Sequence, residues 1–471
     1  MQFSIIIAQK ERENFMKKKF IRTLIAAAMA STMLLMTACG GNAPAGDTTP
    51  PPATTNDGTD APADAGFTGG GGEGTISVGI WDENQRAGLQ TIADLWTAES
   101  GVTVQISVVP WGEYWTMLEA AATGGDLPDV FWMHPNEIQR YMDNDMLLDL
   151  TDMIAADPQV QMDQFPQGLV ELYSNNGRNY GVPKDVDTIA LWYNIAMFEE
   201  AGIETPQPDW TWEDFYDAAV ALTFVREDGS NQWGTSWAPG DNQVGYWNVI
   251  YSMGGYVINE AMTESGFGDP NTIRAMEFVE RLQQNAMPPV EIQAENEKSV
   301  LFAAGSIAMT TEGSWMIPAF RDTFIGNDNI PSGAGVALLP MDAETGGRAS
   351  IYNGLGWSAA ATTSQPENAY ALISWFGSEA MQRKQAELGV TMAAFYGVSD
   401  DWVNAIHEWD VTPYIQMFDY AVMRPHSRNT TVWEWEINDL LTPVWSGTAD
   451  LHTVLADIVT MMNTALANEA Q

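Results

Sequence analysis

The chain has 471 residues, of which 62 are acidic and 20 are basic, so its formal net charge is −42. This charge excludes nucleic acid as a partner, because phosphates are bound by lysine and arginine, and it argues against docking of the folded part on anionic lipid headgroups. The single cysteine, Cys39, excludes intrachain disulfide bonds and a cysteine-based zinc site.

The first 38 residues have the pattern of a secretory signal peptide. The basic run Met16-Lys17-Lys18-Lys19-Phe20 precedes an apolar stretch from Leu24 to Met36. That stretch is roughly 13 residues long, whereas a helix that spans a bilayer needs about 20. We therefore predict a signal peptide over residues 1–38, with Met16 as the true start.

The segment around the cysteine, Leu35-Met36-Thr37-Ala38-Cys39, resembles a bacterial lipobox, in which the thiol takes a diacylglycerol. It departs from the usual pattern at Met36, where leucine is common, and an ordinary signal peptide with an incidental cysteine is the alternative. Residues 41–74 are rich in Gly, Pro, Thr, Ala and Asp and contain no basic residue. We expect a lipidated Cys39 and a disordered tether over 39–74, which would hold the protein on the extracytoplasmic face of a bacterial membrane.

Strands and helices alternate at the start of the body, residues 75–471. Runs of β-branched and aromatic residues predict strands over 75–80, 103–108 and 129–132. Between them, apolar residues at helical spacing predict one helix through Leu89, Ile92 and Trp96 and another over 115–122. This order favours an α/β lobe with a mainly parallel sheet, and the body is long enough for two lobes with separate cores.

A second lobe is predicted from about Asn194 onward. Thr211 is a good helix N-cap with Asp214 at the third helical position, ahead of an apolar stripe. Further elements are expected as a helix over 272–285, a strand over 306–310, a helix opening at Ser364–Glu367 and a last helix over 450–467.

Tryptophan is abundant, with 19 residues, and several lie beside Gly, Asp or Pro at predicted loop edges. Trp81, Trp111, Trp315 and Trp357 are of this kind, although core packing is expected for more than half of all the tryptophans. Aromatic rings cover the apolar faces of sugar rings, while Asp, Glu, Asn and Arg side chains bind their hydroxyls. Parallel sheets bind ligands at the carboxyl ends of their strands, where Trp81, Trp111 and Trp132 fall.

The segment Gly181-Val-Pro-Lys-Asp185-Val-Asp187-Thr-Ile-Ala-Leu-Trp-Tyr193-Asn194 resembles the crossover of family 1 extracellular solute-binding proteins, the maltose-binding-protein-like class. The resemblance continues through Phe302–Met309, Gly313-Ser314-Trp315 and Asn353–Trp357, and it covers essentially all of residues 75–471. It implies an α/β, two-lobe periplasmic-binding-protein-like fold of type II, with a hinge and a ligand cleft between the lobes. Lobe 1 would comprise 75–188 plus 353–405, and lobe 2 would comprise 189–350 plus 410–471.

The resemblance and the loop-edge tryptophans together give the candidate ligand-binding residues. Trp315 matches the stacking aromatic residue of the second lobe. Asp187 matches an acidic crossover position, with a backbone-capping hinge residue as the alternative, and Arg424 could bind ligand or form a surface salt bridge. The full set is Trp81, Glu83, Trp111, Trp132, His134, Asp185, Asp187, Tyr246, Trp247, Glu312, Trp315, Asn353, Trp357, Arg424 and Trp433.

The predicted function is that of a monomeric, non-enzymatic receptor of an ABC importer, which binds a carbohydrate, in particular an oligosaccharide, and delivers it to the permease transmembrane subunits. No cofactor or metal is expected, since the four histidines are scattered. The main alternative is the same fold with a polyamine or a phosphorylated sugar as ligand. A glycoside hydrolase would also combine tryptophans with paired carboxylates, but the sequence has no Gly-x-Ser-x-Gly, His-Glu-x-x-His or Walker motif. A purely structural surface lipoprotein is the third class.

Overall fold

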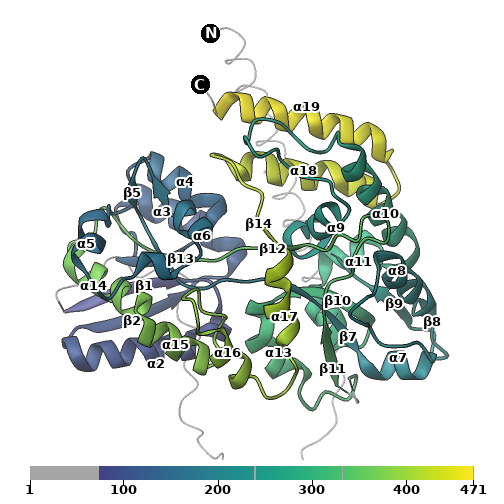
Figure 1. Ribbon diagram of the computed structural model, residues 1–471, viewed down its shortest axis with the longest axis horizontal. Helices are drawn as coiled ribbons and strands as arrows, with labels where there is room; N and C mark the ends of the chain where they lie inside the picture. The colour runs from purple at the N-terminus through teal and green to yellow at the C-terminus, as the bar shows by residue number, and fades with distance from the viewer. Residues whose placement is uncertain (1–73, 238–239, 331–332, 470–471) are drawn as a thin grey trace, which may run out of the picture. The chain divides into compact units, whose positions relative to one another are not determined.

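The computed structural model describes residues 74–237, 240–330 and 333–469 (Figure 1). The predicted signal peptide, Cys39 and all but the last residue of the predicted tether lie outside the described residues. Within the described ranges, no helix combines the length and the apolar character that crossing a membrane requires.

The first sheet has the strand order β2-β1-β3-β13-β6. Its first three strands are β1 (Thr75–Ile80), β2 (Thr103–Val108) and β3 (Val130–Met133), and β1 pairs parallel to both neighbours. This confirms the predicted strands and their parallel arrangement. The other two strands, β13 (Gly356–Ala359) and β6 (Val182–Pro183), come from distant parts of the chain and pair antiparallel.

Helix boundaries in this lobe follow local chemistry. The first helix, α2 (Glu83–Ser100), begins where the Asp82 side chain accepts the Asn84 N–H, and it ends at Gly101, whose φ of 74° favours glycine. The next helix, α3, begins at Trp111 rather than at the expected Trp115, since Pro110 stands at its N-cap. The helices that accompany this sheet are α2, α3 (Trp111–Gly124), α4 (Pro135–Asp143), α5 (Thr151–Ala156), α6 (Gln167–Leu172), α14 (Pro366–Gly377), α15 (Glu379–Glu387) and α16 (Ser399–Ala405), with a short hairpin of β4 (Ser174–Asn175) and β5 (Arg178–Asn179).

The second sheet has the order β11-β7-β10-β9-β8. Its central strand, β10, pairs antiparallel to β7 and parallel to β9, so this sheet is mixed. The strands are β7 (Ile189–Asn194), β8 (Phe224–Val225), β9 (Asn231–Thr235), β10 (Ile307–Gly313) and β11 (Ala334–Ala337). The accompanying helices are α7 (Ile195–Ala201), α8 (Trp212–Ala221), α9 (Trp247–Ser252), α10 (Pro270–Ala286), α11 (Val290–Glu295), α12 (Lys298–Ala303) and α13 (Ile317–Phe324).

The N-terminus of α8 is a capping box, as the sequence predicts. The Asp214 N–H donates to the Thr211 hydroxyl at 3.2 Å, and the Thr211 N–H donates to the Asp214 carboxylate at 2.8 Å. Trp212, Phe215 and Ala219 are buried along one face of the helix. The box and the stripe therefore fix where α8 starts and which face it buries.

Three chain segments connect the two sheets. The first two meet where Asp187 and Asn353 form an antiparallel bridge. The third segment contains α17 (Thr412–Gln416) and β14 (Ala421–Met423), which pairs parallel to β12 (Ser350–Tyr352). In Figure 1 these elements are drawn between the two sheets.

The last two helices, α18 (Thr430–Trp445) and α19 (Leu451–Glu469), lie side by side (Figure 1). One face of α19 is buried through Leu451, Val454, Leu455, Ile458 and Met462, which confirms the predicted stripe.

Two clusters of buried apolar residues form the interior, but their boundary does not follow the expected separation of the lobes. Trp192 on β7 lies 4.7 Å from Phe320 of α13 and 5.1 Å from Trp409, measured between ring centroids. Its indole N–H donates to the Tyr414 hydroxyl at 2.7 Å. The first core therefore continues into the second lobe, because the segment that contains Trp409 and Tyr414 packs against β7.

Candidate functional site

A cavity of about 800 Å³ lies between the two lobes. Its wall contains residues that follow β1, residues at the start of α3 and α4, residues of the crossing segments, and residues of α12 and α13 from the second lobe. Seven of the predicted ligand-binding residues line it, namely Trp81, Trp111, His134, Asp185, Asp187, Trp315 and Asn353. This volume falls within the range of small-molecule sites, about 300–1,000 Å³.

Two tryptophans form the aromatic part of the wall on the first lobe. Trp81 directly follows β1, and Trp111 begins α3; their ring centroids lie 5.2 Å apart at an interplanar angle of 69°. Trp132 lies beneath them, fully buried and 4.9 Å from Trp81, so it supports the wall without lining it. Such edge-to-face contacts hold aromatic rings in fixed orientations.

Trp315 contributes an indole from the second lobe. It follows β10 in a short 3-10 turn over Ser314–Met316 and is partly buried. A Cβ at Gly313 would collide with this ring. Glycine at that position therefore lets the Trp315 ring fold back over the end of the strand.

The two crossover aspartates differ in how their charge is balanced. Asp185 pairs with Lys184 at 2.5 Å and accepts the Leu355 N–H at 2.8 Å. Asp187 is 7 % exposed and accepts one side-chain hydrogen bond, from Gln243 Nε2 at 3.3 Å. Burial raises the pKa of Asp187 well above its ordinary value, and Asp185 adds to this rise while Arg424 opposes it.

His134 is a neutral part of the wall. Its Nδ1 accepts the Asn136 N–H at 3.2 Å and caps α4, and its Nε2 lies 3.0 Å from the side-chain amide of Asn353. Burial lowers the pKa of His134 well below its ordinary value, and the positive charge of Arg424 lowers it further. The ring is therefore uncharged at neutral pH.

The other predicted residues do not line this cavity. Five aromatic ones are buried in the core; Trp357, for example, stacks on Phe376 with centroids 4.4 Å apart. Glu83 is exposed in the first turn of α2, where it pairs with Arg86 at 3.3 Å. Glu312 pairs with Lys298 at 3.5 Å, and burial raises its pKa to about 7. The set outside the cavity wall is Glu83, Trp132, Tyr246, Trp247, Glu312, Trp357, Arg424 and Trp433.

Arg424 joins the lobes behind the cavity wall. It is 4 % exposed, pairs with Glu434 of α18 at 2.6 Å and donates to Gln243 at 2.9 Å and to Asn136 of α4. The Asn136 amide in turn donates to Glu434 at 3.1 Å. The guanidinium thus belongs to a buried interlobe network and is not part of a surface salt bridge.

Several lining residues escaped the sequence analysis. Gln243 belongs to a π-helical turn, and Glu297 precedes α12, while Asp322 and Thr323 are exposed residues of α13. Polar residues on a short amphipathic helix are common, so no local pattern marks these positions. No group of histidine, cysteine and acidic side chains in the described ranges could hold a metal ion.

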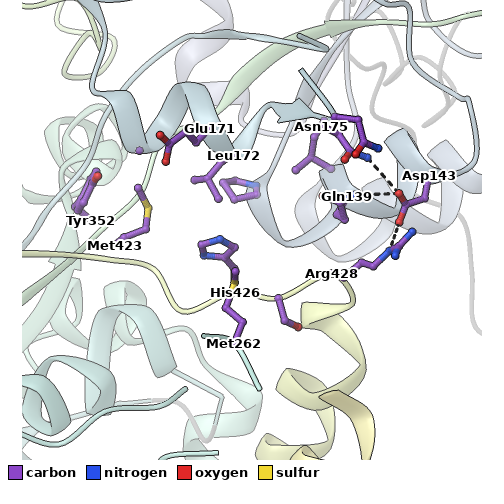
Figure 2. A pocket seen from close by; sticks show the side chains of 15 residues that line it. Gln139, Asp143, Glu171, Leu172, Asn175, Met262, Tyr352, Met423, His426 and Arg428 are labelled. Atoms are coloured by element: carbon purple, nitrogen blue, oxygen red, sulfur yellow. Dashed lines mark hydrogen bonds and ion pairs between the residues drawn. The ribbon is translucent and has the colours of Figure 1, made fainter. Parts of the chain in front are cut away.

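A second cavity, of about 700 Å³, lies between α4 and α6 on one side and the segment before α18 on the other (Figure 2). Arg428 pairs with Asp143 at 2.6 Å at its edge, and the Asp143 carboxylate also accepts hydrogen bonds from Gln139 and Asn175. Tyr352 lines this cavity while its neighbour Asn353 lines the first one. Adjacent residues of an extended segment point to opposite sides, so the two cavities lie on opposite sides of this crossing segment. The second cavity contains no tryptophan.

Two α/β lobes, three connecting segments and a cavity between the lobes define a two-lobe periplasmic binding protein. The model of the bacterial extracellular solute-binding protein family matches residues 81–383, and the chain belongs to this family.

Named relatives are distant. Three Brucella binding proteins are 24% identical over 247 residues, which cover 50% of this chain and 57% of each relative, so the chain spans little more than half of their length. The galactooligosaccharide-binding protein of Bacillus subtilis is 22% identical over 339 residues, which are 68% of this chain and 73% of that protein. Among solved structures, an ABC substrate-binding protein of Listeria monocytogenes in complex with cycloalternan has a TM-score of 0.75 at 20% identity and covers 83% of this chain and 99% of its own. These likenesses confirm the fold.

Proposed function

We propose that this protein is the extracytoplasmic receptor of an ABC importer and binds a carbohydrate in the cavity between its lobes. The main support for this proposal is the position of three tryptophans in the cavity wall. Trp81 and Trp111 lie on one side and Trp315 lies on the other, beside carboxylate and amide side chains. Indoles offer apolar platforms to sugar ring faces, and the polar groups suit hydroxyls. The names of the relatives that bind galactooligosaccharide and cycloalternan support the same ligand class.

Binding would draw the lobes together. Each lobe contributes part of the cavity wall, so a ligand gains its full set of contacts only when the lobes are close, and it shifts the population toward that state. We assign residues 75–188 plus 353–405 to lobe 1 and 189–350 plus 410–471 to lobe 2, with the hinge in the segments that meet at Asp187 and Asn353. The closed complex would deliver its sugar to the permease transmembrane subunits.

Titration calorimetry of the full-length protein with a panel of neutral mono- and oligosaccharides of both anomeric linkages tests the ligand class. We expect saturable binding of at least one member, with a rise in melting temperature, because a ligand that binds only the folded state stabilises it. Binding of polyamines with no response to any sugar would contradict the proposal. Release of sugar fragments from labelled oligosaccharides would contradict its non-enzymatic part.

The location of the receptor rests on the N-terminal sequence. Cys39 in its lipobox-like segment would carry a diacylglycerol and hold the protein, as a monomer, beside the permease. Metabolic labelling with a radioactive fatty acid tests this: the wild-type protein should be labelled and membrane-bound, whereas Cys39→Ala should be unlabelled and released. Equal labelling of both would contradict lipidation at Cys39.

A further inference from the structure

The cavity wall is unusual in the sign of its charges. Five carboxylate side chains line it, and no lysine or arginine does. Its one histidine, His134, is neutral for the reasons given above. The carboxylates are those of Asp82, Asp185, Asp187, Glu297 and Asp322.

The cations closest to the crossover are already engaged. Lys184 is fully buried and holds Asp185 at 2.5 Å and the Gln85 amide oxygen at 2.8 Å. Arg424 forms an ion pair with Glu434 at 2.6 Å. Neither places a nitrogen within ion-pairing distance of the Asp187 carboxylate, and no other lysine, arginine or histidine of the described ranges does so.

Asp187 is therefore a buried carboxylate in a ligand cavity without a cation of its own. Burying a charge costs free energy unless an opposite charge or several hydrogen bonds compensate it. Gln243, at 3.3 Å, supplies a long hydrogen bond from a neutral group, and the Asn353 backbone N–H is a second neutral donor. A positive group on the ligand would supply the missing compensation, whereas a carboxylate or phosphate on the ligand would be repelled by Asp187 and its four acidic neighbours.

We propose that the cavity recognises a basic amino sugar, with the protonated amine of the sugar placed against the Asp187 carboxylate and a sugar ring stacked on the tryptophans. This inference rests on the proposed carbohydrate function and narrows it. A linear polyamine would satisfy the charge but would leave three indoles without a ring face to cover. An acidic or phosphorylated sugar could stack its ring on the indoles, but its anionic group would be repelled by the carboxylates of the wall.

Calorimetry with matched sugars tests the charge preference. The probes are glucosamine, galactosamine and mannosamine, each compared with the neutral hexose and the hexuronate of the same stereochemistry, together with chitosan and cello-oligosaccharides and with spermidine. In every stereochemical series that binds, we expect the amine to bind at least tenfold more tightly than the neutral sugar, and the hexuronate to bind most weakly.

Asp187→Asn keeps the shape of the side chain and removes its charge. It should abolish the advantage of the amine, so that the amine and the neutral sugar of one series bind this variant with affinities within about threefold of each other. Asp457→Asn, on the exposed face of α19, changes the net charge by the same amount and should leave the advantage intact.

The outcomes separate the two proposals. If a neutral sugar binds as tightly as its amine, or if Asp187→Asn keeps the preference, the amino-sugar inference is overturned and the carbohydrate function stands. If spermidine binds and no sugar of any charge does, the carbohydrate function itself fails. If nothing in the panel binds, including the neutral oligosaccharides, both fail.

Discussion

Trp315 is the aromatic residue that the second lobe brings to the cavity, so its removal tests whether both lobes contact the ligand. We expect Trp315→Ala to weaken sugar binding by about 10- to 100-fold, because the indole contributes both buried area and a stacking face. Calorimetry measures the change. Trp435→Ala is the control: this indole is 60 % exposed on α18, outside the cavity wall, and its loss should leave the affinity unaltered. Equal affinities of Trp315→Ala and wild type would remove Trp315 from the site.

Asp187 should reduce stability in the absence of ligand. Because its pKa is raised in the folded state, the folded protein holds the proton more tightly than the unfolded chain, and stability falls as the pH rises through that raised pKa. Asp187→Asn has no such titration. Its melting temperature at neutral pH should exceed that of the wild type by about 1–3 °C, and the difference should shrink as the pH is lowered.

Melting curves between pH 4 and 8 measure this difference. The charged groups that bear on Asp187 are Asp185, Lys184 and Arg424, and all three stay in the variant. A destabilised Asp187→Asn at pH 7 would mean that the carboxylate is better compensated than its hydrogen bonds indicate.

Tryptophans at loop edges were good but incomplete guides to the site. Trp81, Trp111 and Trp315 follow a strand or begin a helix, and these ends face the cavity. Trp357 also sits among glycines, but it lies within β13, a strand covered on both faces, and is fully buried. Flanking residues reveal where a chain turns, but not whether another segment covers the turn, and that depends on contacts between distant parts of the sequence.

The α8 capping box is an element-scale feature that the sequence alone predicts. Thr211→Ala removes the hydroxyl that accepts the Asp214 N–H, so we expect a loss of about 1 kcal/mol in the free energy of unfolding. Urea denaturation measures it. Thr460→Ala is the matched control, since Thr460 is an exposed interior residue of α19. Alanine there should be neutral or slightly stabilising. Equal losses in both variants would show that the box contributes nothing specific.

The sequence predicted helices and strands well where neighbouring residues alone determine them. Strands β1 and β2 and the apolar face of α19 match the expectations closely. The sequence did not predict that β13 would pair with β3 or that β6 would pair with β13, because these pairings join residues far apart in the chain. The expected N-cap signature at Ser364 was also imprecise: α14 begins at Pro366, and Gln365 makes no capping hydrogen bond through its side chain. Proline at the first helical position fixes that start without a cap.

At the scale of the whole molecule, the net charge of −42 should make stability depend on salt. Repulsion between like charges destabilises a compact state, and salt screens it, with the Debye length falling from about 30 Å at 0.01 M to about 8 Å at 0.15 M. We expect a higher melting temperature at 0.15 M than at 0.01 M sodium chloride. An equal concentration of a neutral osmolyte controls for crowding, and an unchanged or lower melting temperature in salt would contradict self-repulsion.

The interlobe network sets how easily the lobes separate without ligand. Asn136 connects α4 of the first lobe to Arg424 and to Glu434 of α18, so Asn136→Ala removes both direct contacts while leaving the Arg424–Glu434 pair intact. The variant should open more readily, with a larger radius of gyration by small-angle X-ray scattering. Its sugar affinity should fall by the factor by which the closed population falls.

Asn144→Ala, at the end of the same helix, provides the control, because the exposed Asn144 side chain donates to the Arg140 carbonyl of that helix. If Asn136→Ala kept the wild-type radius and affinity, the contacts between α4 and α18 would be incidental, and lobe closure would depend on the ligand alone. If the radius rose while affinity held, the ligand would bind the open protein as well as the closed one, and the cavity would not need both walls. Only a coupled change in radius and affinity fits a receptor whose ligand completes the contact between its lobes.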